Sequence, residues 1–209
     1  MALNILKSRF SSVCTIFFFL YNSTMKIFPA KSFDIPDILK IEHAAFIPAI
    51  QEKQATFEER LRVFPEGFLL LSDNSPKTVL ENGKPLTAGY FTSEIWPCVP
   101  KTDNIFMLGH SAEKTHDPNG SVLYFSSFAL LPAFQGKKLA EPFLTGCLDS
   151  ICGAFPQIKQ IILLVNEEWH GAKHLYEKLG FKELRTIKDF FPSLKKNASD
   201  GIVMLKSVE

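Results

Sequence analysis

The sequence predicts an α/β (α+β) fold in which helices cover a central mixed sheet. Strand-like and helix-like hydrophobic patterns alternate along the chain, in the order β-α-α-β-β-β-α-β-α-β-β. Adjacent strands without a helix between them, combined with strand–helix–strand steps, are typical of such a sheet. The 209 residues show neither an internal repeat nor an interdomain linker, so we expect one domain with a sizeable core.

The first half of the chain begins with a strand at 26–30. Asp34 is then a helix N-cap, and Pro36 lies in the first turn of the helix that follows. Apolar residues recur at helical spacing from Ile38 to Phe46. A second helix is expected at 56–63, followed by strands at 68–71 and 88–91.

The second half opens with an irregular stretch, 97–120, whose length indicates a functional or disordered loop. We expect a strong strand at 122–131, a helix at 138–154, a buried strand at 157–165, a helix at 169–179 and strands at 181–190 and 201–207. Gly180 has the position of a helix-terminating C′ glycine.

Composition narrows the classes of partner. Hydrophobic residues make up 46% and charged residues 22%, the balance of a soluble globular protein. The formal net charge of +1 gives no global field for nucleic acid or an anionic membrane, and we expect neither as a partner. The 20 phenylalanines indicate a thick aromatic core or an apolar substrate pocket.

The cysteines indicate a reducing compartment. Cys14, Cys98, Cys147 and Cys152 form no CxxC pair, and no histidine lies at zinc-ligand spacing from a cysteine pair. We therefore expect free, buried thiols, a cytoplasmic location and no metal.

Residues 1–24 are expected to be a dispensable extension or the result of a misassigned start, with the domain spanning 25–209. A signal peptide is the alternative, because Lys7 and Arg9 precede the apolar run 13–20. That run is too short to cross a bilayer as a helix.

The turn Gln135–Ala140, between the strand at 122–131 and the next helix, carries the most chemistry. A helix N-terminus offers unpaired N–H groups and the positive end of the macrodipole, which together bind phosphate. Gly136 lets the backbone approach an anion, and Lys137 and Lys138 add positive charge. The alternative is an ordinary strand–turn–helix with solvated lysines.

Two motifs resemble the GNAT N-acetyltransferases. Gln135-x-x-Lys138-x-Ala140 is similar to that family's Q/R-x-x-G-x-G/A, and 175–181 is similar to its Y-E-K-x-G-F signature. Lys138 departs from the motif because it stands at the middle glycine, and Trp169 stands where many relatives have asparagine. Asn166 is a candidate to replace that asparagine.

The resemblance implies a GNAT fold, with a twisted, mostly antiparallel sheet of about seven strands and helices on both faces. It also implies acetyl-CoA as co-substrate. The implied cofactor-binding residues are Phe128, Ala129, Leu130, Gln135, Gly136, Lys137, Lys138, Leu139, Ala140 and Asn166.

A closer resemblance is to the arylalkylamine N-acetyltransferases. It rests on 42–47 (E-H-A-A-F-I), on 93–96 (S-E-I-W) and on the histidine-containing loop before the strand at 122–131. The paired histidines of that group correspond here to Tyr124 and Ser126. The resemblance implies a small-molecule amine as acceptor, handled by a monomer or a homodimer.

The implied reaction is direct attack of an amine on the acetyl-CoA thioester. Tyr176 is the expected general acid, since a phenol of pKa about 10 stays protonated at neutral pH. The oxyanion is assigned to backbone N–H groups near 128–130. The base stays open among Glu42, Glu94, His110, His116 and Tyr124. Alternatively, Tyr124 and Ser126 line a water chain that carries the proton away.

Five aromatic residues are candidates for the acceptor pocket or for the core: Phe46, Phe57, Phe64, Trp96 and Phe106.

Two other functions remain open from the sequence. One is a protein or peptide N-acetyltransferase on the same fold. The other is a non-catalytic acetyl-CoA-binding module, which the lysine at position 138 favours.

Overall fold

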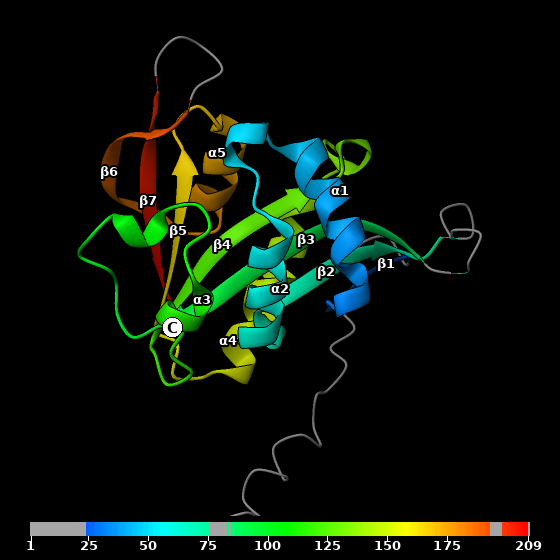
Figure 1. Ribbon diagram of the computed structural model, residues 1–209, viewed down its shortest axis with the longest axis horizontal. Coiled ribbons are helices and arrows are strands. Elements are labelled where there is room, and N and C mark those ends of the chain that lie inside the picture. Colours follow the sequence, from blue (N-terminus) through cyan, green and yellow to red (C-terminus); the bar gives the residue numbers. More distant parts are fainter. Residues whose placement is uncertain (1–23, 76–82, 84, 193–197, 209) are drawn as a thin grey trace, which may run out of the picture.

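A computed structural model describes residues 24–75, 83, 85–192 and 198–208, and it contains one seven-stranded sheet (Figure 1). The strands are β1 (Met25–Pro29), β2 (Phe68–Asp73), β3 (Leu86–Trp96), β4 (Val122–Leu130), β5 (Gln160–Asn166), β6 (Lys182–Phe191) and β7 (Ser199–Ser207). Their order across the sheet is β1-β2-β3-β4-β5-β7-β6. Neighbouring strands are antiparallel except β4 and β5, which are parallel.

Helices cover both faces of this sheet. The four longer helices are α1 (Ile35–Ala45), α2 (Gln54–Val63), α4 (Ala140–Ala154) and α5 (His170–Lys178), and the four-residue α3 (Ala112–Thr115) lies in the long loop. Helices α1 and α2 lie on one face and α4 and α5 on the other (Figure 1). The predicted fold class and order of elements are therefore confirmed.

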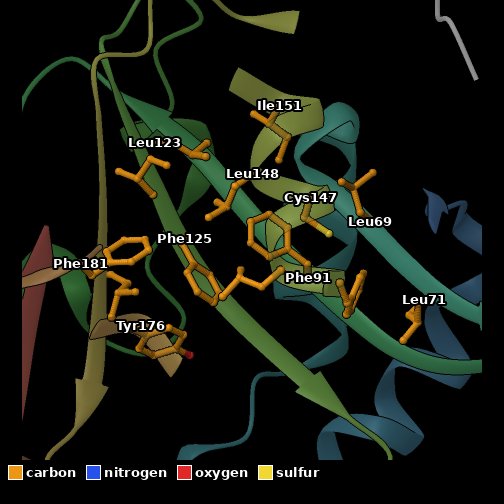
Figure 2. Close-up of a cluster of buried hydrophobic side chains, with 14 of the residues drawn as sticks. Leu69, Leu71, Phe91, Leu123, Phe125, Cys147, Leu148, Ile151, Tyr176 and Phe181 are labelled. Carbon is orange, nitrogen blue, oxygen red and sulfur yellow. The ribbon is translucent and has the colours of Figure 1, made fainter. Parts of the chain in front are cut away.

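Alternation along the strands assigns each side chain to one of two cores. Phe68, Leu70 and Tyr90 pack with α1 and α2, whereas Leu69, Leu71 and Phe91 pack against α4. Figure 2 shows the second core, with Phe125 beside Tyr176 at its edge and the Tyr176 hydroxyl pointing away from Phe181. Tyr176 is thus held by apolar packing while its polar end remains at the margin of the core.

Most predicted boundaries agree within three residues. The largest difference is the end of the strand expected at 88–91, because β3 continues to Trp96, which pairs with Val122 of β4. Helix α4 begins at Ala140 rather than 138, because Lys138 adopts a left-handed backbone with φ 58°. Strand β5 begins at Gln160 rather than 157, because Ile158 N–H bonds to Phe155 O in the turn after α4. Residues 195–197 of the expected polar turn at 195–201 lie outside the described residues, and β7 begins within this turn, at Ser199.

Several other predictions have mixed outcomes. Cys98, Cys147 and Cys152 are free as expected, but only Cys147 is buried and Cys98 is exposed. Cys14 and the extension 1–24, except Thr24, lie outside the described residues. Among the helices that the structure describes, none has the length and apolar character needed to cross a bilayer. The cytoplasmic location stays a prediction.

Candidate active site

The site begins where β4 and β5 separate. These parallel strands pair only from Val122 with Gln160 to Phe125 with Leu163. Beyond that point, β4 continues to Leu130 along β3, and β5 continues to Asn166 along β7. The two strands therefore diverge in the middle of the sheet, and each leaves one edge without a partner strand.

A bulge in β4 marks the start of this splay. Thr92 pairs with Ser127 and Ser93 pairs with Phe125, so Ser126 is an extra residue without a partner in β3. The Ser126 Oγ compensates with hydrogen bonds to Thr92 Oγ1 (2.8 Å) and Thr92 O (3.0 Å). Bulges re-aim side chains next to active sites, and this one lies at the point of divergence.

The free edge of β4 offers backbone groups to a ligand. Leu131 N–H donates to Ala88 O (2.9 Å) in β3, and N–H directions alternate along a strand. Ala129 N–H therefore points toward β3, whereas the N–H groups of Phe128 and Leu130 point into the splay. Gln135 Nε2 donates to Leu130 O (3.0 Å), which joins the turn at 135–140 to this edge.

A cavity of about 640 Å³ lies between the end of β4, the turn and the first turns of α5. Seven of the ten predicted cofactor-binding residues line it: Phe128, Ala129, Leu130, Gln135, Gly136, Ala140 and Asn166. Lys137, Lys138 and Leu139 do not line it, and both lysines are exposed. The ammonium groups of the two lysines therefore lie near the solvent-exposed part of any ligand in this cavity, and not near its buried part.

The turn has two left-handed residues, Gly136 with φ 70° and Lys138 with φ 58°. A glycine at either position avoids the steric cost of this conformation. At position 138 the chain keeps the backbone shape and carries a side chain in addition. Lys138 therefore differs from the glycine of the motif in its side chain and in the steric cost of its left-handed backbone conformation.

A second cavity, of about 360 Å³, lies on the other side of the splay. Its wall combines apolar side chains of the long loop and β6 with polar groups of α1, α2 and β4. Phe46, Ile50, Phe128, Trp169, Tyr176 and Pro192 line both cavities. The two cavities therefore meet at Phe128 and Tyr176.

Tyr176 is fixed in place by its ring and its backbone. Its ring lies edge-on to Phe125 (centroids 5.6 Å apart). Phe181 N–H donates to Tyr176 O and Gly180 N–H donates to Glu177 O (both 3.0 Å), the two bonds of a Schellman motif that ends α5. Burial raises the pKa of the Tyr176 phenol, so the hydroxyl stays protonated.

A buried chain of hydrogen bonds connects α1 to β4. Glu42, which is 1% exposed, accepts hydrogen bonds from Glu52 N–H (2.7 Å) and the Tyr90 hydroxyl. The Tyr90 oxygen in turn contacts Ser127 Oγ at 2.8 Å. Because the single proton of Tyr90 goes to Glu42, Ser127 must be the donor to Tyr90. Desolvation outweighs these bonds and raises the pKa of the Glu42 carboxyl above its usual value.

Two further acidic residues around the second cavity already have partners. Glu52 Oε1 accepts from Arg60 Nη2 (2.8 Å) and Gly109 N–H (3.3 Å). Glu94 is bonded to His110 Nε2 and the Thr115 hydroxyl. Burial raises the pKa of Glu94, but hydrogen bonding and the charge of His110 outweigh it and lower that pKa overall. Of these three buried carboxyls, only Glu42 has no ion-pair partner among the described residues.

A curated relative identifies the family. The chain is 30% identical over 122 residues to YbbJ, an uncharacterised N-acetyltransferase of Bacillus subtilis, and the match covers 56% of this chain and 76% of YbbJ. The chain belongs to the GNAT superfamily of N-acetyltransferases. The comparison with models of protein families finds no match.

Solved structures share the GNAT fold. The ribosomal-protein-S18-alanine N-acetyltransferase of Escherichia coli superposes with a TM-score of 0.63 at 18% identity, covering 88% of this chain and 94% of that one. NAA60 of Arabidopsis thaliana in complex with acetyl-CoA gives 0.65 at 14% identity, covering 88% and 99%. Together with the relative, they support an acetyl-CoA-dependent N-acetyltransferase of GNAT type. Among the described residues, no group of three metal-ligating side chains converges.

The geometry separates the candidate bases of this GNAT protein. His116 does not line either cavity: its Nδ1 accepts from Ile95 N–H (3.1 Å) and its ring packs on Phe64. Both nitrogens of His110 already face acceptors, Glu94 Oε1 and Met107 O. Glu94 does not line the cavity either. Glu42 and Tyr124 do, but burial raises the pKa of the Tyr124 phenol, which keeps it protonated and leaves no phenolate to accept a proton.

The five aromatic residues that were candidates for the pocket or the core divide between these two places. Phe46 and Phe106 line the second cavity. Phe57, Phe64 and Trp96 belong to the core, each at most 3% exposed.

Sequence reasoning missed four residues around this cavity: Glu52, Arg60, Tyr90 and Ser127. Arg60 had a readable signal, because it stands three residues after Phe57 on the buried face of α2, where a charge is unusual. The other three give no such signal, since their roles depend on which distant side chains they meet.

Proposed function

We propose that this chain transfers the acetyl group of acetyl-CoA to the primary amine of a small molecule, by direct attack of the amine on the thioester. The observation that carries the proposal is the meeting of two cavities at Tyr176 and Phe128, with a polar chain leading away from one of them. A ternary reaction needs this arrangement, since both reactants must reach the same point from different sides.

Acetyl-CoA is assigned to the larger cavity. The free N–H groups of Phe128 and Leu130 are suited to hold the pantetheine amides and the acetyl carbonyl. The N-terminus of α4 and Gly136 receive the pyrophosphate, for which their backbone groups and dipole are suited. Lys137 and Lys138 lie outside the cavity and are exposed, where their charges would suit the remaining phosphate of the cofactor.

The acceptor is assigned to the smaller cavity, and Glu42 is the base. An ammonium group loses a proton to Ser127 Oγ, Ser127 passes its own proton to Tyr90, and Tyr90 passes its proton to Glu42. The last two hops follow contacts present in the structure, and the first requires the amine to bind next to Ser127, which lines the cavity. The raised pKa of Glu42 suits the role, because a base works best when its pKa approaches the working pH.

The remaining steps belong to β4 and α5. The neutral amine forms the C–N bond, and the thioester carbonyl becomes an oxyanion that the Phe128 N–H is placed to stabilise. When the C–S bond breaks, Tyr176 donates its proton to the departing thiolate. Its hydroxyl has no hydrogen-bond partner among the described residues, so it is free to do so.

The size and lining of the smaller cavity support a compact, apolar amine of the arylalkylamine type. A volume of about 360 Å³ is near the lower end of the range for small-molecule sites. Phe106, Met107, Phe190 and Phe191 supply apolar surface, while Glu42 is the acidic group available to a cation.

Two measurements test the proposal. Saturating acetyl-CoA should raise the melting temperature, because a ligand that binds only the folded state stabilises it. Thiol release should then appear with tryptamine, phenethylamine or spermidine. No thermal shift would contradict acetyl-CoA binding. A shift without release for any amine or peptide would indicate a non-catalytic module, and release with peptides alone would indicate a protein N-acetyltransferase.

A further inference from the structure

Three aromatic rings from three separate elements form a continuous row beside the junction of the two cavities. Phe46 follows α1, Trp169 precedes α5, and Phe191 ends β6. The ring centroids of Phe46 and Trp169 are 5.7 Å apart, and those of Trp169 and Phe191 are 5.5 Å apart. Trp169 is therefore the central member, and it connects one side of the splay to the other.

The row separates the junction from solvent. Phe46 and Trp169 line both cavities, and Phe191 lines the acceptor cavity. All three side chains are only partly buried, so the row borders solvent as well as the cavities. We call Phe46, Trp169 and Phe191 the aromatic clasp.

The other walls of the acceptor cavity are held more firmly. Two hydrogen bonds fasten the long loop, one from Gly109 N–H to Glu52 (3.3 Å), just before α2, and one from the Ser111 hydroxyl to Glu59 (2.8 Å) in α2. Within the described part of the chain, ring contacts join the three members of the clasp to one another, each worth about 0.5–1.5 kcal/mol. Truncating one ring should therefore open this side without disturbing the walls that carry Glu42.

We propose that the aromatic clasp sets acceptor specificity: it admits compact amines and excludes peptide N-termini by closing the junction between α1 and β6. The inference rests on the proposed function. A peptide must place its terminal amine at the junction while the following residues leave the site, and the clasp occupies the space between the two elements through which they would leave. Trp169 acts here as a specificity-determining residue rather than a catalytic one.

The test uses variants that open the clasp and variants that keep it. Trp169→Ala and Phe191→Ala remove a ring from different elements. Trp169→Phe keeps a ring, and Leu184→Ala truncates an exposed apolar residue elsewhere on β6 as a matched control. For each variant, kcat/KM is measured with tryptamine and with tetra-alanine amide, and the acetyl-CoA thermal shift is recorded.

The expected result is a change in preference. In Trp169→Ala and Phe191→Ala, the ratio of tryptamine to peptide kcat/KM should fall by about tenfold or more, the scale on which pocket contacts discriminate between substrates. Leu184→Ala should leave the ratio unchanged, and Trp169→Phe should lower it less than Trp169→Ala. Phe191→Ala and Leu184→Ala should keep the acetyl-CoA shift, because neither residue lines the larger cavity. Should Trp169→Ala fail to fold, Phe191→Ala decides the question from the other end of the row.

The outcomes distinguish the two claims. Wild-type activity on tryptamine with the same ratio in the opened variants overturns the clasp and leaves the proposed function intact. Wild-type activity on the peptide equal to that on tryptamine also overturns the clasp. Wild type that acetylates neither acceptor overturns the proposed function, and the clasp with it.

Discussion

The two cavities that meet at Tyr176 are built in different ways. The larger one combines the end of β4 and the turn at 135–140, which offer backbone groups, with the start of α5, the segment after α1 and Pro192. The smaller one is made from side chains that meet across long sequence distances, such as Tyr90 with Glu42 and His110 with Glu94. The predicted cofactor-binding residues that line the larger cavity, apart from Asn166, thus lie within 128–140, whereas the polar contacts around the smaller cavity join residues far apart in the sequence.

This difference explains what each side tolerates. On the cofactor side a lysine occupies a position where the GNAT motif has glycine, yet the backbone keeps its left-handed shape. On the acceptor side, each buried charge depends on one or two particular partners. We therefore expect substitutions on the acceptor side to have the larger effects.

The largest effect is expected for Glu42→Gln. If Glu42 is the base, kcat/KM should fall about 10³-fold, within the range for general base catalysis. Glu42 acts only when ionised, so wild-type activity should fall as the pH drops through its raised pKa, and the variant should lack that acidic limb. Thiol release measured against pH checks this. Glu58→Gln, on the exposed side of α2, should behave like wild type, and equal rates for the two variants would remove Glu42 as base.

Arg60→Met comes next and acts on stability. Arg60 and Glu52 are 3% and 8% exposed, so removing the cation leaves a buried carboxylate without its partner. We expect a loss of about 3 kcal/mol in the free energy of unfolding. Denaturant unfolding of Arg60→Met, Glu52→Gln and the double variant measures the coupling. Losses in the two single variants that simply add up in the double variant would mean that the pair contributes nothing as a pair.

Tyr176→Phe tests the junction itself. It keeps the ring contacts with Phe125 and Phe181 and removes only the hydroxyl, so kcat should fall about 10²-fold. The acetyl-CoA thermal shift should hardly change, because the hydroxyl serves the departing thiolate rather than the bound thioester. An unchanged kcat would assign thiolate protonation to another group.

The smallest effect is expected on the cofactor side, for Lys138→Gly. Relief of the left-handed strain outweighs the extra freedom of glycine in the unfolded chain, so stability should rise by about 0.5–1 kcal/mol. Lys137 is not among the residues with positive φ, and Lys137→Gly should lower stability instead. Thermal melts of the two variants show whether each substitution raises or lowers stability. A change in the same direction for both would show that position 138 carries no strain.

The sequence was sufficient for the fold and for much of the cofactor side. Hydrophobic periodicity and turn residues identified the strands and the four longer helices, because these signals arise within a few residues of chain. Gln135, Gly136 and Ala140 line the larger cavity for the same reason: the motif describes a local backbone shape.

The acceptor side was only partly accessible to sequence reasoning. Glu42, His110 and Tyr124 were among the candidates, and they do surround the cavity. The sequence could not show which of the three is the best candidate base, because that depends on their contacts with Tyr90, Ser127 and Glu52. His116 illustrates the difficulty, because it lies in the same loop as His110 and yet packs against Phe64.

The brief pairing of β4 with β5 has a mechanical consequence. Four residue pairs are all that join the strands β1 to β4 with the strands β5, β7 and β6 along the sheet. Without ligand, the sheet therefore consists of two halves that are joined by this short parallel pairing and supported by the helices. A cofactor lying along the edge of β4 would form hydrogen bonds where β4 has no partner strand. Its binding should therefore slow amide hydrogen exchange at Phe128 and Leu130 and make the two halves of the sheet move as one body.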